Sequence, residues 1–217
     1  MTGKLTILLQ PITQRLRRRR FHFFLRLIKD LPRPLTILDI GGTEAYWEQV
    51  GLQEDEIRII LLNLEQSTVN NPRIFSSIAG NATDLIAWPD QSIDLVFSNS
   101  VIEHLFTKEN QHQMASEVRR VARSYFIQTP NYYFPIEPHW LFPFFQFLPR
   151  SWRIALTRFA AWGHMPKLPD PVQAANLVDE VKMLTPREMK ALFPSGSLYY
   201  EKWLGMTKSV SSYYIRK

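Results

Sequence analysis

The 217-residue sequence contains no cysteine. A disulfide scaffold, a thiolate zinc site and a cysteine nucleophile are therefore excluded, and a reducing compartment fits the chain. No apolar run reaches the roughly 18 residues that a membrane-spanning helix needs, and the N-terminal apolar run covers only Leu5 to Leu9. We therefore expect neither a signal peptide nor a spanning segment, and we expect a cytoplasmic protein.

Glycine is scarce, with 8 residues, yet Gly41 and Gly42 stand side by side. They follow a largely apolar run, Leu35 to Ile40, that contains a single acid, Asp39. Continuous apolar character is typical of a parallel strand buried on both faces, and glycine lets the backbone turn sharply and approach a ligand. The pattern predicts the first strand of a doubly wound sheet, with a ligand at its carboxyl end.

Acids are outnumbered, and the net charge is +6. Much of the excess comes from Arg15 and Arg17–Arg20, on a helix that we expect to begin with Thr13 as its N-cap and to end near Leu31. Its apolar face either covers one flank of the sheet or lies on a lipid surface, which would make residues 13–31 a peripheral membrane contact. Because the arginines cluster on one terminal helix, the sequence disfavours a nucleic-acid partner.

The rest of the chain alternates apolar runs with helical patterns, as α/β proteins do. Strands are predicted at residues 35–40, 57–62, 73–78, 93–98, 124–129, 198–204 and 208–215, and helices at 44–50, 111–121, 151–162 and 185–193. A turn is predicted at residues 168–171. The predicted fold class is α/β, a Rossmann-like seven-stranded mostly parallel sheet with helices on both faces and an antiparallel last strand. We expect a basic amphipathic helix in residues 1–31 and one domain in residues 32–217, with an aromatic insertion at 131–165.

Polar residues follow the predicted strands at the edge where a ligand would lie. Asn63 and Glu65 come some 22 to 24 residues after Gly41, the spacing at which such folds place a polar side chain on a ribose. The alternative is that they begin the next helix, with Glu65 near its positive end. The later strands run into Asn81 and into Asn99.

Two stretches resemble a known family. GNATDLIAWPDQSIDLVFSNSVIEHL, residues 80–105, is similar to the region "GDA-x-x-LPFPDNSFDLVxSxxVxEHL" of the class I S-adenosylmethionine-dependent methyltransferases, particularly the type 11 group. QTPNYYFPIEPHWLFPFFQFLP, residues 128–149, is similar to a segment of a bacterial subgroup of that family. With the order of elements, the resemblance covers about residues 35 to 215. It implies a methyltransferase with S-adenosyl-L-methionine as its cofactor.

The resemblance also implies a role for each polar strand end. It places the methionine part of the cofactor on Gly41 and Gly42, with Asp39 orienting the ammonium group. It assigns the ribose hydroxyls to Asn63, with Glu65 as second choice. The other implied contacts are Asn81 with the adenine amino group, Ala82 as the adjacent backbone donor, and Ser98 with Asn99 beside the methyl group.

The chain departs from the family pattern at several of these positions. The family usually has acids where Asn63 and Asn81 stand, and a fuller glycine motif would continue where this chain has Thr43 and Ala45. A second hypothesis is therefore a non-catalytic methyltransferase-like binding module that docks to a membrane or a protein partner. A nicotinamide-dependent dehydrogenase is disfavoured because the loop lacks a third glycine six positions on.

The candidate catalytic residues are His104, Glu137 and His139, because histidine titrates near neutral pH and a nearby carboxylate can orient it. The alternative is that His104 starts a helix and that the other two satisfy polar groups inside the aromatic insertion. The insertion follows the fifth strand, the side on which the family takes its acceptor, and we expect it to form an acceptor lid. The acceptor is expected to be a small molecule, a sugar or an amphiphilic lipid-like compound. No metal site is expected.

Overall fold

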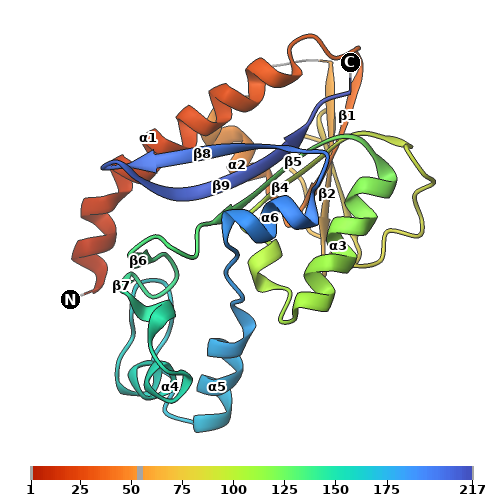
Figure 1. Ribbon diagram of the computed structural model, residues 1–217. Helices are drawn as coiled ribbons and strands as arrows, with labels where there is room; N and C mark the ends of the chain where they lie inside the picture. The colour runs from red at the N-terminus through yellow and green to blue at the C-terminus, as the bar shows by residue number, and fades with distance from the viewer. Residues whose placement is uncertain (1, 53–55, 217) are drawn as a thin grey trace.

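The computed structural model describes residues 2–52 and 56–216, and for residues 2–10 and 12 it describes the backbone alone. A seven-stranded sheet lies at its centre, with the strand order β3-β2-β1-β4-β5-β9-β8 (Figure 1). The strands are β1 (Leu35–Ile40), β2 (Ile57–Asn63), β3 (Phe75–Ala79), β4 (Ile93–Asn99), β5 (Ala122–Pro130), β8 (Ser197–Trp203) and β9 (Met206–Tyr214). β1 to β5 are mutually parallel, and β9 runs antiparallel to both of its neighbours. The predicted Rossmann-like fold is confirmed.

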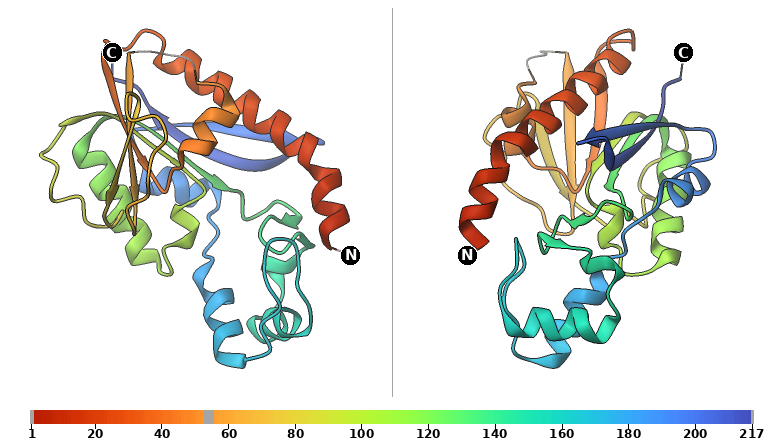
Figure 2. Two further views of the ribbon diagram at one scale, coloured as in Figure 1. Left: turned by 180° about the vertical axis from the view of Figure 1, so that it is seen from behind. Right: turned by 60° about the vertical axis from the view of Figure 1, so that its left-hand side comes forward.

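Helices cover both faces of the sheet (Figure 2). One face carries α1 (Thr2–Ile28) and α2 (Glu44–Val50), and the other carries α3 (Lys108–Val121) and α6 (Pro186–Leu192). Successive side chains of a strand point to opposite faces, so Ile37 packs in the core under α1 while Leu38 packs in the core under α3. The continuous apolar runs read from the sequence follow from this double coverage.

The N-terminal helix differs from the prediction in two ways. It begins at Thr2 instead of Thr13 and continues through Pro11, although an interior proline removes one hydrogen bond and crowds the preceding turn. Arg20 belongs to the arginine cluster and not to the apolar face that was expected to be covered, yet it is buried and pairs with Glu201 of β8 at 2.8 Å. Phe21 and Phe24 pack between the helix and the sheet, as expected if this helix covers one flank of the sheet.

Two connections also differ from the prediction. No helix lies between β2 and β3 in the described residues, so Glu65 does not begin one. The turn predicted at 168–171 leads into a helix that the sequence analysis missed, α5 (Pro171–Glu180), with Asp170 as its N-cap and Pro171 in its first turn.

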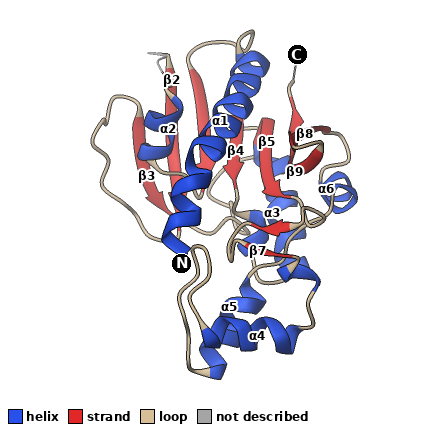
Figure 3. Cartoon of the chain, turned by 90° about the vertical axis from the view of Figure 1, so that its left-hand side faces the viewer, coloured by secondary structure: helices blue, strands red, loops and turns tan. Residues whose placement is uncertain are grey.

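The aromatic segment after β5 forms a small body of its own at the carboxyl ends of the parallel strands (Figure 3). It contains β6 (Ile136–Glu137), β7 (Phe142–Pro143), a short 3-10 helix η2 (Phe145–Phe147), α4 (Arg150–Phe159) and α5. Asn131 bridges to Leu184, so the segment leaves and rejoins the sheet domain at one place. We call residues 131–184 the insert, which extends past the predicted end at residue 165.

The insert has its own apolar core. Trp140 stacks on Phe145 with ring centroids 4.4 Å apart, and Val178 of α5 belongs to the same cluster. Of the helices in the described residues, none combines the length and the apolar character needed to cross a membrane.

Candidate functional site

The loop after β1 is shaped by one buried acid and two glycines. Gly41 adopts φ +73°, a conformation that strongly favours glycine, and a Cβ there would lie 2.3 Å from the side chain of Val101. A Cβ on Gly42 would lie 1.8 Å from the carboxylate of Asp39. Neither glycine can be replaced without moving a neighbour, so the loop holds its backbone close to the Asp39 carboxyl group.

Asp39 lies inside the site with 1% of its surface exposed, and Trp47 of α2 donates an indole hydrogen bond of 2.6 Å to it. Burial raises the pKa of Asp39 to about 8, against a smaller lowering by Trp47. The carboxyl group is therefore mostly protonated at neutral pH until a cation approaches it.

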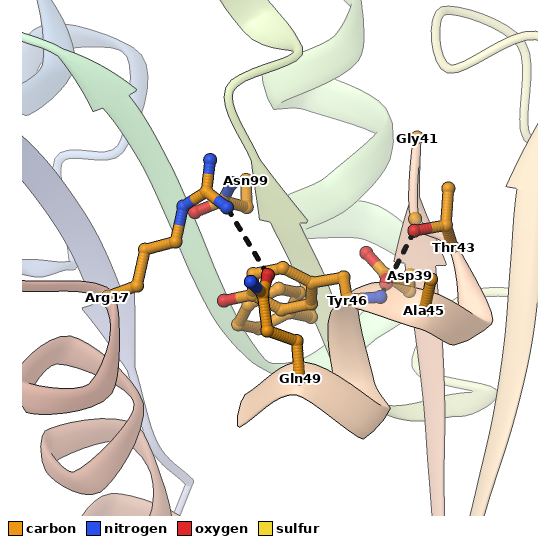
Figure 4. A pocket seen from close by; sticks show the side chains of 10 residues that line it. Arg17, Asp39, Gly41, Thr43, Ala45, Tyr46, Gln49 and Asn99 are labelled. Carbon is orange, nitrogen blue, oxygen red and sulfur yellow. Dashed lines mark hydrogen bonds between the residues drawn. The ribbon is translucent and has the colours of Figure 1, made fainter. Parts of the chain in front are cut away.

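A cavity of about 310 Å³ opens beside this loop (Figure 4). Its walls include Asp39, Gly41 and Gly42 from β1 and its loop, Tyr46 and Gln49 from α2, Asn99 from β4, and Arg17 from α1. Arg17 reaches toward Gln49, with 3.5 Å between the donor and acceptor atoms. The cavity thus offers a guanidinium and a carboxyl group, which suit the carboxylate and the ammonium of an α-amino acid.

The predicted ribose residues lie next to this loop. Asn63, at the end of β2, donates a hydrogen bond of 2.9 Å from Nδ2 to the carbonyl oxygen of Gly42, which leaves its Oδ1 as an acceptor. Glu65 is exposed two residues further on. Both stay predictions as ribose ligands, and Asn63 is the one joined to the glycine loop.

The residues predicted to contact the adenine and the methyl group differ in their burial and in their hydrogen-bond partners. Asn81 is exposed and its Oδ1 accepts hydrogen bonds from the backbone and side chain of Thr83, at 3.0 and 2.9 Å. Ala82 is buried beside it. Ser98 is fully buried and donates to the carbonyl oxygen of Ile40 at 3.1 Å, whereas Asn99 lines the cavity and accepts from Arg20 at 2.9 Å.

The three predicted catalytic residues come together beyond the ends of β4 and β5. Nδ1 of His139 lies 2.5 Å from Oε1 of Glu137, and Nε2 of His139 lies 3.1 Å from Nε2 of His104. Nδ1 of His104 lies 3.3 Å from Oε1 of Glu180, at the end of α5. Glu137 and His139 lie 33 or more positions after His104 in the sequence, and the fold brings all three into successive contact.

Glu103 completes this group. It is fully buried, Oε2 accepts a hydrogen bond of 2.9 Å from Thr129, and Oε1 has no hydrogen-bond partner within the described residues. Burial raises the pKa of Glu103 to about 7, although the charge of His139 opposes this. Burial and the charge of His139 lower the pKa of His104. Burial would also lower the pKa of His139, but the hydrogen bond and the charge of Glu137 outweigh it and raise that pKa.

Sequence reasoning missed Arg17, Tyr46 and Gln49 because they face the cavity from helices, where spacing predicts only a solvent face or a core face. It also missed Glu103 and Glu180. Glu103 stands beside His104 in the VIEHL stretch, which could have signalled it, while the tertiary fold alone brings Glu180 to His104.

The sheet order separates this fold from the dinucleotide-binding one, in which the strand after β5 continues the parallel series. Here the antiparallel β9 lies between β5 and β8. A methyltransferase from Archaeoglobus fulgidus that depends on S-adenosylmethionine is similar over 92% of this chain and 93% of its own, at 13% identity and a TM-score of 0.51. A Rhodobacter sphaeroides chain described as a Zn-dependent alcohol dehydrogenase is similar over 88% of this chain and 87% of its own, at 13% identity and a TM-score of 0.54. At these identities the likeness shows the fold alone.

The sequence match is more specific than the likeness of folds. Residues 40–125, which hold the glycine loop, the strand ends and Glu103-His104, match the model of the type 11 methyltransferase family, described as "Methyltransferase domain". Residues 40–125 therefore have the sequence of a methyltransferase domain, and S-adenosylmethionine is the cofactor of the proteins that share this domain and fold. An uncharacterised protein of Mycobacterium tuberculosis is 38% identical over 64 residues, which are 30% of this chain. The matched segment spans only 21% of that relative.

Proposed function

We propose that this protein is an S-adenosylmethionine-dependent methyltransferase that acts on a small or amphiphilic acceptor. The observation that carries the proposal is the cavity at the carboxyl ends of β1 and β4, where the strand order reverses and open α/β sheets bind their ligands. Its residues fit the cofactor, because Arg17 and Asp39 provide opposite partners for an amino acid and Gly42 leaves no room for any side chain.

In this proposal Asp39 and Arg17 hold the amino-acid part of the cofactor, Asn63 holds the ribose hydroxyls with Glu65 as second choice, and Asn81 and Ala82 face the adenine. Ser98 and Asn99 lie near the reacting methyl group. When bound, S-adenosylmethionine supplies an electrophilic methyl group on a sulfonium. Transfer then depends largely on alignment and on the exclusion of water, which the loop and the insert provide.

An acceptor hydroxyl must lose its proton during transfer. In this proposal His139 accepts it at Nε2, which the acceptor hydroxyl reaches by taking the place of His104 on that nitrogen, while Glu137 holds the ring through Nδ1. The carboxylate of Glu137 then balances the positive charge that His139 gains.

The insert supports an amphiphilic acceptor. Several of its aromatic side chains are exposed, among them Tyr133, Phe144 and Phe147, which follow β5 in the chain. Arg15, Arg18 and Arg19 are exposed on α1, so contact with an anionic membrane is part of the proposal. Because the apolar side chains of α1 from Leu16 to Ile28 are buried against the sheet, contact through Arg15, Arg18 and Arg19 would be electrostatic and would weaken with salt.

Calorimetry with S-adenosylmethionine and S-adenosylhomocysteine tests the cofactor. We expect saturable binding of both at one site, and no heat of binding from folded protein would favour a non-catalytic binding module. The acceptor is tested by incubating the protein with methyl-labelled cofactor and a cell extract. We expect the label in the fraction that organic solvent extracts, and label confined to the aqueous fraction would reject an amphiphilic acceptor.

A further inference from the structure

Two imidazole rings face each other across an unusual contact. Their Nε2 atoms are 3.1 Å apart and their planes are nearly perpendicular, at 89°. On the far side of each ring, Nδ1 faces a carboxylate, Glu137 for His139 and Glu180 for His104.

These carboxylates decide where the ring hydrogens lie. A neutral imidazole carries one N–H, and a carboxylate beside Nδ1 favours the N–H at that nitrogen. Both Nε2 atoms of His104 and His139 then present lone pairs to each other. Two facing lone pairs repel, so the arrangement requires a cation between them, either a proton or a metal ion.

The position of Glu103 favours a metal ion over a shared proton. One of its carboxylate oxygens and a nitrogen of each histidine all lie within 4.8 Å of one another. Its side chain is fully buried and Oε1 lacks a hydrogen-bond partner in the described part of the chain. A buried carboxylate oxygen without a partner is costly, and a shared proton between the histidines would leave it so.

We propose that His104, His139 and Glu103 bind one divalent transition metal ion such as Zn²⁺, with an open position for an oxygen atom of the methyl acceptor. Two nitrogens on one tetrahedral zinc at about 2.0–2.1 Å stand about 3.3 Å apart, close to the separation of the two Nε2 atoms. Two histidines, one carboxylate and an open position form a ligand set of catalytic zinc. Glu137 and Glu180 take the place of the outer carboxylates that orient metal-bound histidines.

The role of the open position rests on the proposed methyl transfer, whereas metal binding itself does not. A metal ion acidifies a bound hydroxyl, so it would replace His139 as the means of activating the acceptor. The hydroxyl proton passes to water, the oxygen–methyl bond forms as the sulfur–methyl bond breaks, and the sulfur keeps the electron pair. The acceptor class this predicts is a compound with a hydroxyl or phenol at the reacting end.

The test is a titration of the full chain, stripped with a chelator, with ZnCl₂, MnCl₂ and MgCl₂ separately. We expect one equivalent of Zn²⁺ to bind, with a visible absorption band when Co²⁺ replaces it. His104→Ala, His139→Ala and Glu103→Gln should each weaken zinc binding at least about 100-fold, and Glu137→Gln about 10- to 100-fold. His112→Ala, a change of an exposed histidine on α3, is the matched control and should leave binding unchanged.

No saturable binding of any of the three ions, or zinc binding that survives in both histidine variants, would overturn the metal site in favour of a shared proton. Circular dichroism and cofactor calorimetry on each variant show whether it still folds. The outcomes separate the two proposals, since cofactor binding without zinc binding rejects only the metal site, and zinc binding without cofactor binding rejects only the methyltransferase.

Discussion

The contact between Asp39 and Gly42 affects both the backbone shape of the loop after β1 and the charge state of the Asp39 carboxyl group. The Asp39 carboxylate occupies the place where any side chain at position 42 would begin. The same burial that brings the two together raises the pKa of Asp39 to about 8. The same contact between Asp39 and Gly42 therefore sets both the packing of the glycine loop and the pKa of its carboxyl group.

Gly42→Ala should weaken S-adenosylmethionine binding. The added methyl group must push Asp39 or the loop aside, and such overpacking costs about 1–3 kcal/mol. Calorimetry should show a loss of affinity of about 5- to 150-fold. The control is Gly205→Ala in the β8–β9 turn, where φ is +80° and a Cβ meets nothing. It should lower stability without changing cofactor affinity, and an unaltered affinity of Gly42→Ala would contradict the placement of the cofactor on this loop.

Cofactor affinity should rise with pH because of Asp39. The cofactor ammonium favours the ionised carboxylate, while the free protein keeps it protonated below about pH 8. Affinity should therefore rise by up to about tenfold per pH unit from pH 6 to 8 and level off above 8. The free energy of unfolding depends on pH with the opposite sign. The raised pKa of Asp39 contributes stability that is fully present below its unfolded value of 3.8, and this contribution is lost as the pH rises through about 8.

Calorimetry between pH 6 and 9 in buffers of different ionisation enthalpy measures the released proton. Asp39→Asn keeps an acceptor for the Trp47 indole and removes the titration. Its affinity should not follow pH over this range. A wild-type affinity that stays flat from pH 6 to 8 would show that Asp39 does not face the ammonium.

At the scale of elements, α1 is part of the site as well as of the core. Its Leu16, Phe21, Phe24 and Ile28 are buried, and Arg17 and Arg20 turn toward the carboxyl ends of the strands. Arg20 joins α1 to β8 through Glu201 and to the cavity through Asn99. The helix thus forms one wall of the cavity proposed for the cofactor while it covers the sheet.

Arg20→Met should lower the free energy of unfolding by about 3–5 kcal/mol, because it leaves the buried carboxylate of Glu201 without its main partner. Lys208, 3.8 Å from Glu201, offsets part of the loss. Urea unfolding measures the change. Arg19→Met, at an exposed position of the same helix, should change stability by no more than about 0.5 kcal/mol. The double change Arg20→Met with Glu201→Met should recover stability, and equal effects of the two single arginine changes would refute the role of the pair.

At the scale of the whole molecule, the insert has a core separate from the two cores of the sheet domain. It meets the sheet domain near Asn131 and Leu184, through the contacts of His139 and Glu180 with His104, and through the ring contact of Phe134 with Trp203 of β8. Because the insert has its own core, we expect that it can be loosened while the sheet domain stays folded.

Trp140→Ala should open the insert while the sheet stays folded. Trp140 is buried, stacks on Phe145 and donates to Thr157 at 2.9 Å, and deleting such a side chain costs about 3–5 kcal/mol. Hydrogen exchange should increase across residues 131–184 and remain slow in β1, β4 and β5, with cofactor affinity unchanged. Trp152→Ala, at a side chain that is 64% exposed, should leave exchange as in the wild type. Faster exchange throughout the sheet would show that the insert and the sheet domain fold as one unit.

Much of the fold could be predicted because local signals agree with it. The bounds predicted for β1 and α2 are those of the structure, and Thr185 with Pro186 marks the start of α6 through a capping box. The predictions failed where a helix is held by tertiary contacts. α5 is kept in place by packing on α4 and by the insert core, and its short pattern looked like a turn.

The sequence alone determined the alternation of strands and helices, the strand ends at which polar residues gather, and the family, because these follow from periodicity and from motifs contiguous in the chain. Only the tertiary structure decided what those residues face. It buried Arg20 against Glu201, set Arg17 opposite Asp39, and brought Glu103, His104, His139 and Glu180 into one group. Contacts between residues of different elements carry no signal in local spacing, since the packing of the helices, the strands and the insert fixes them.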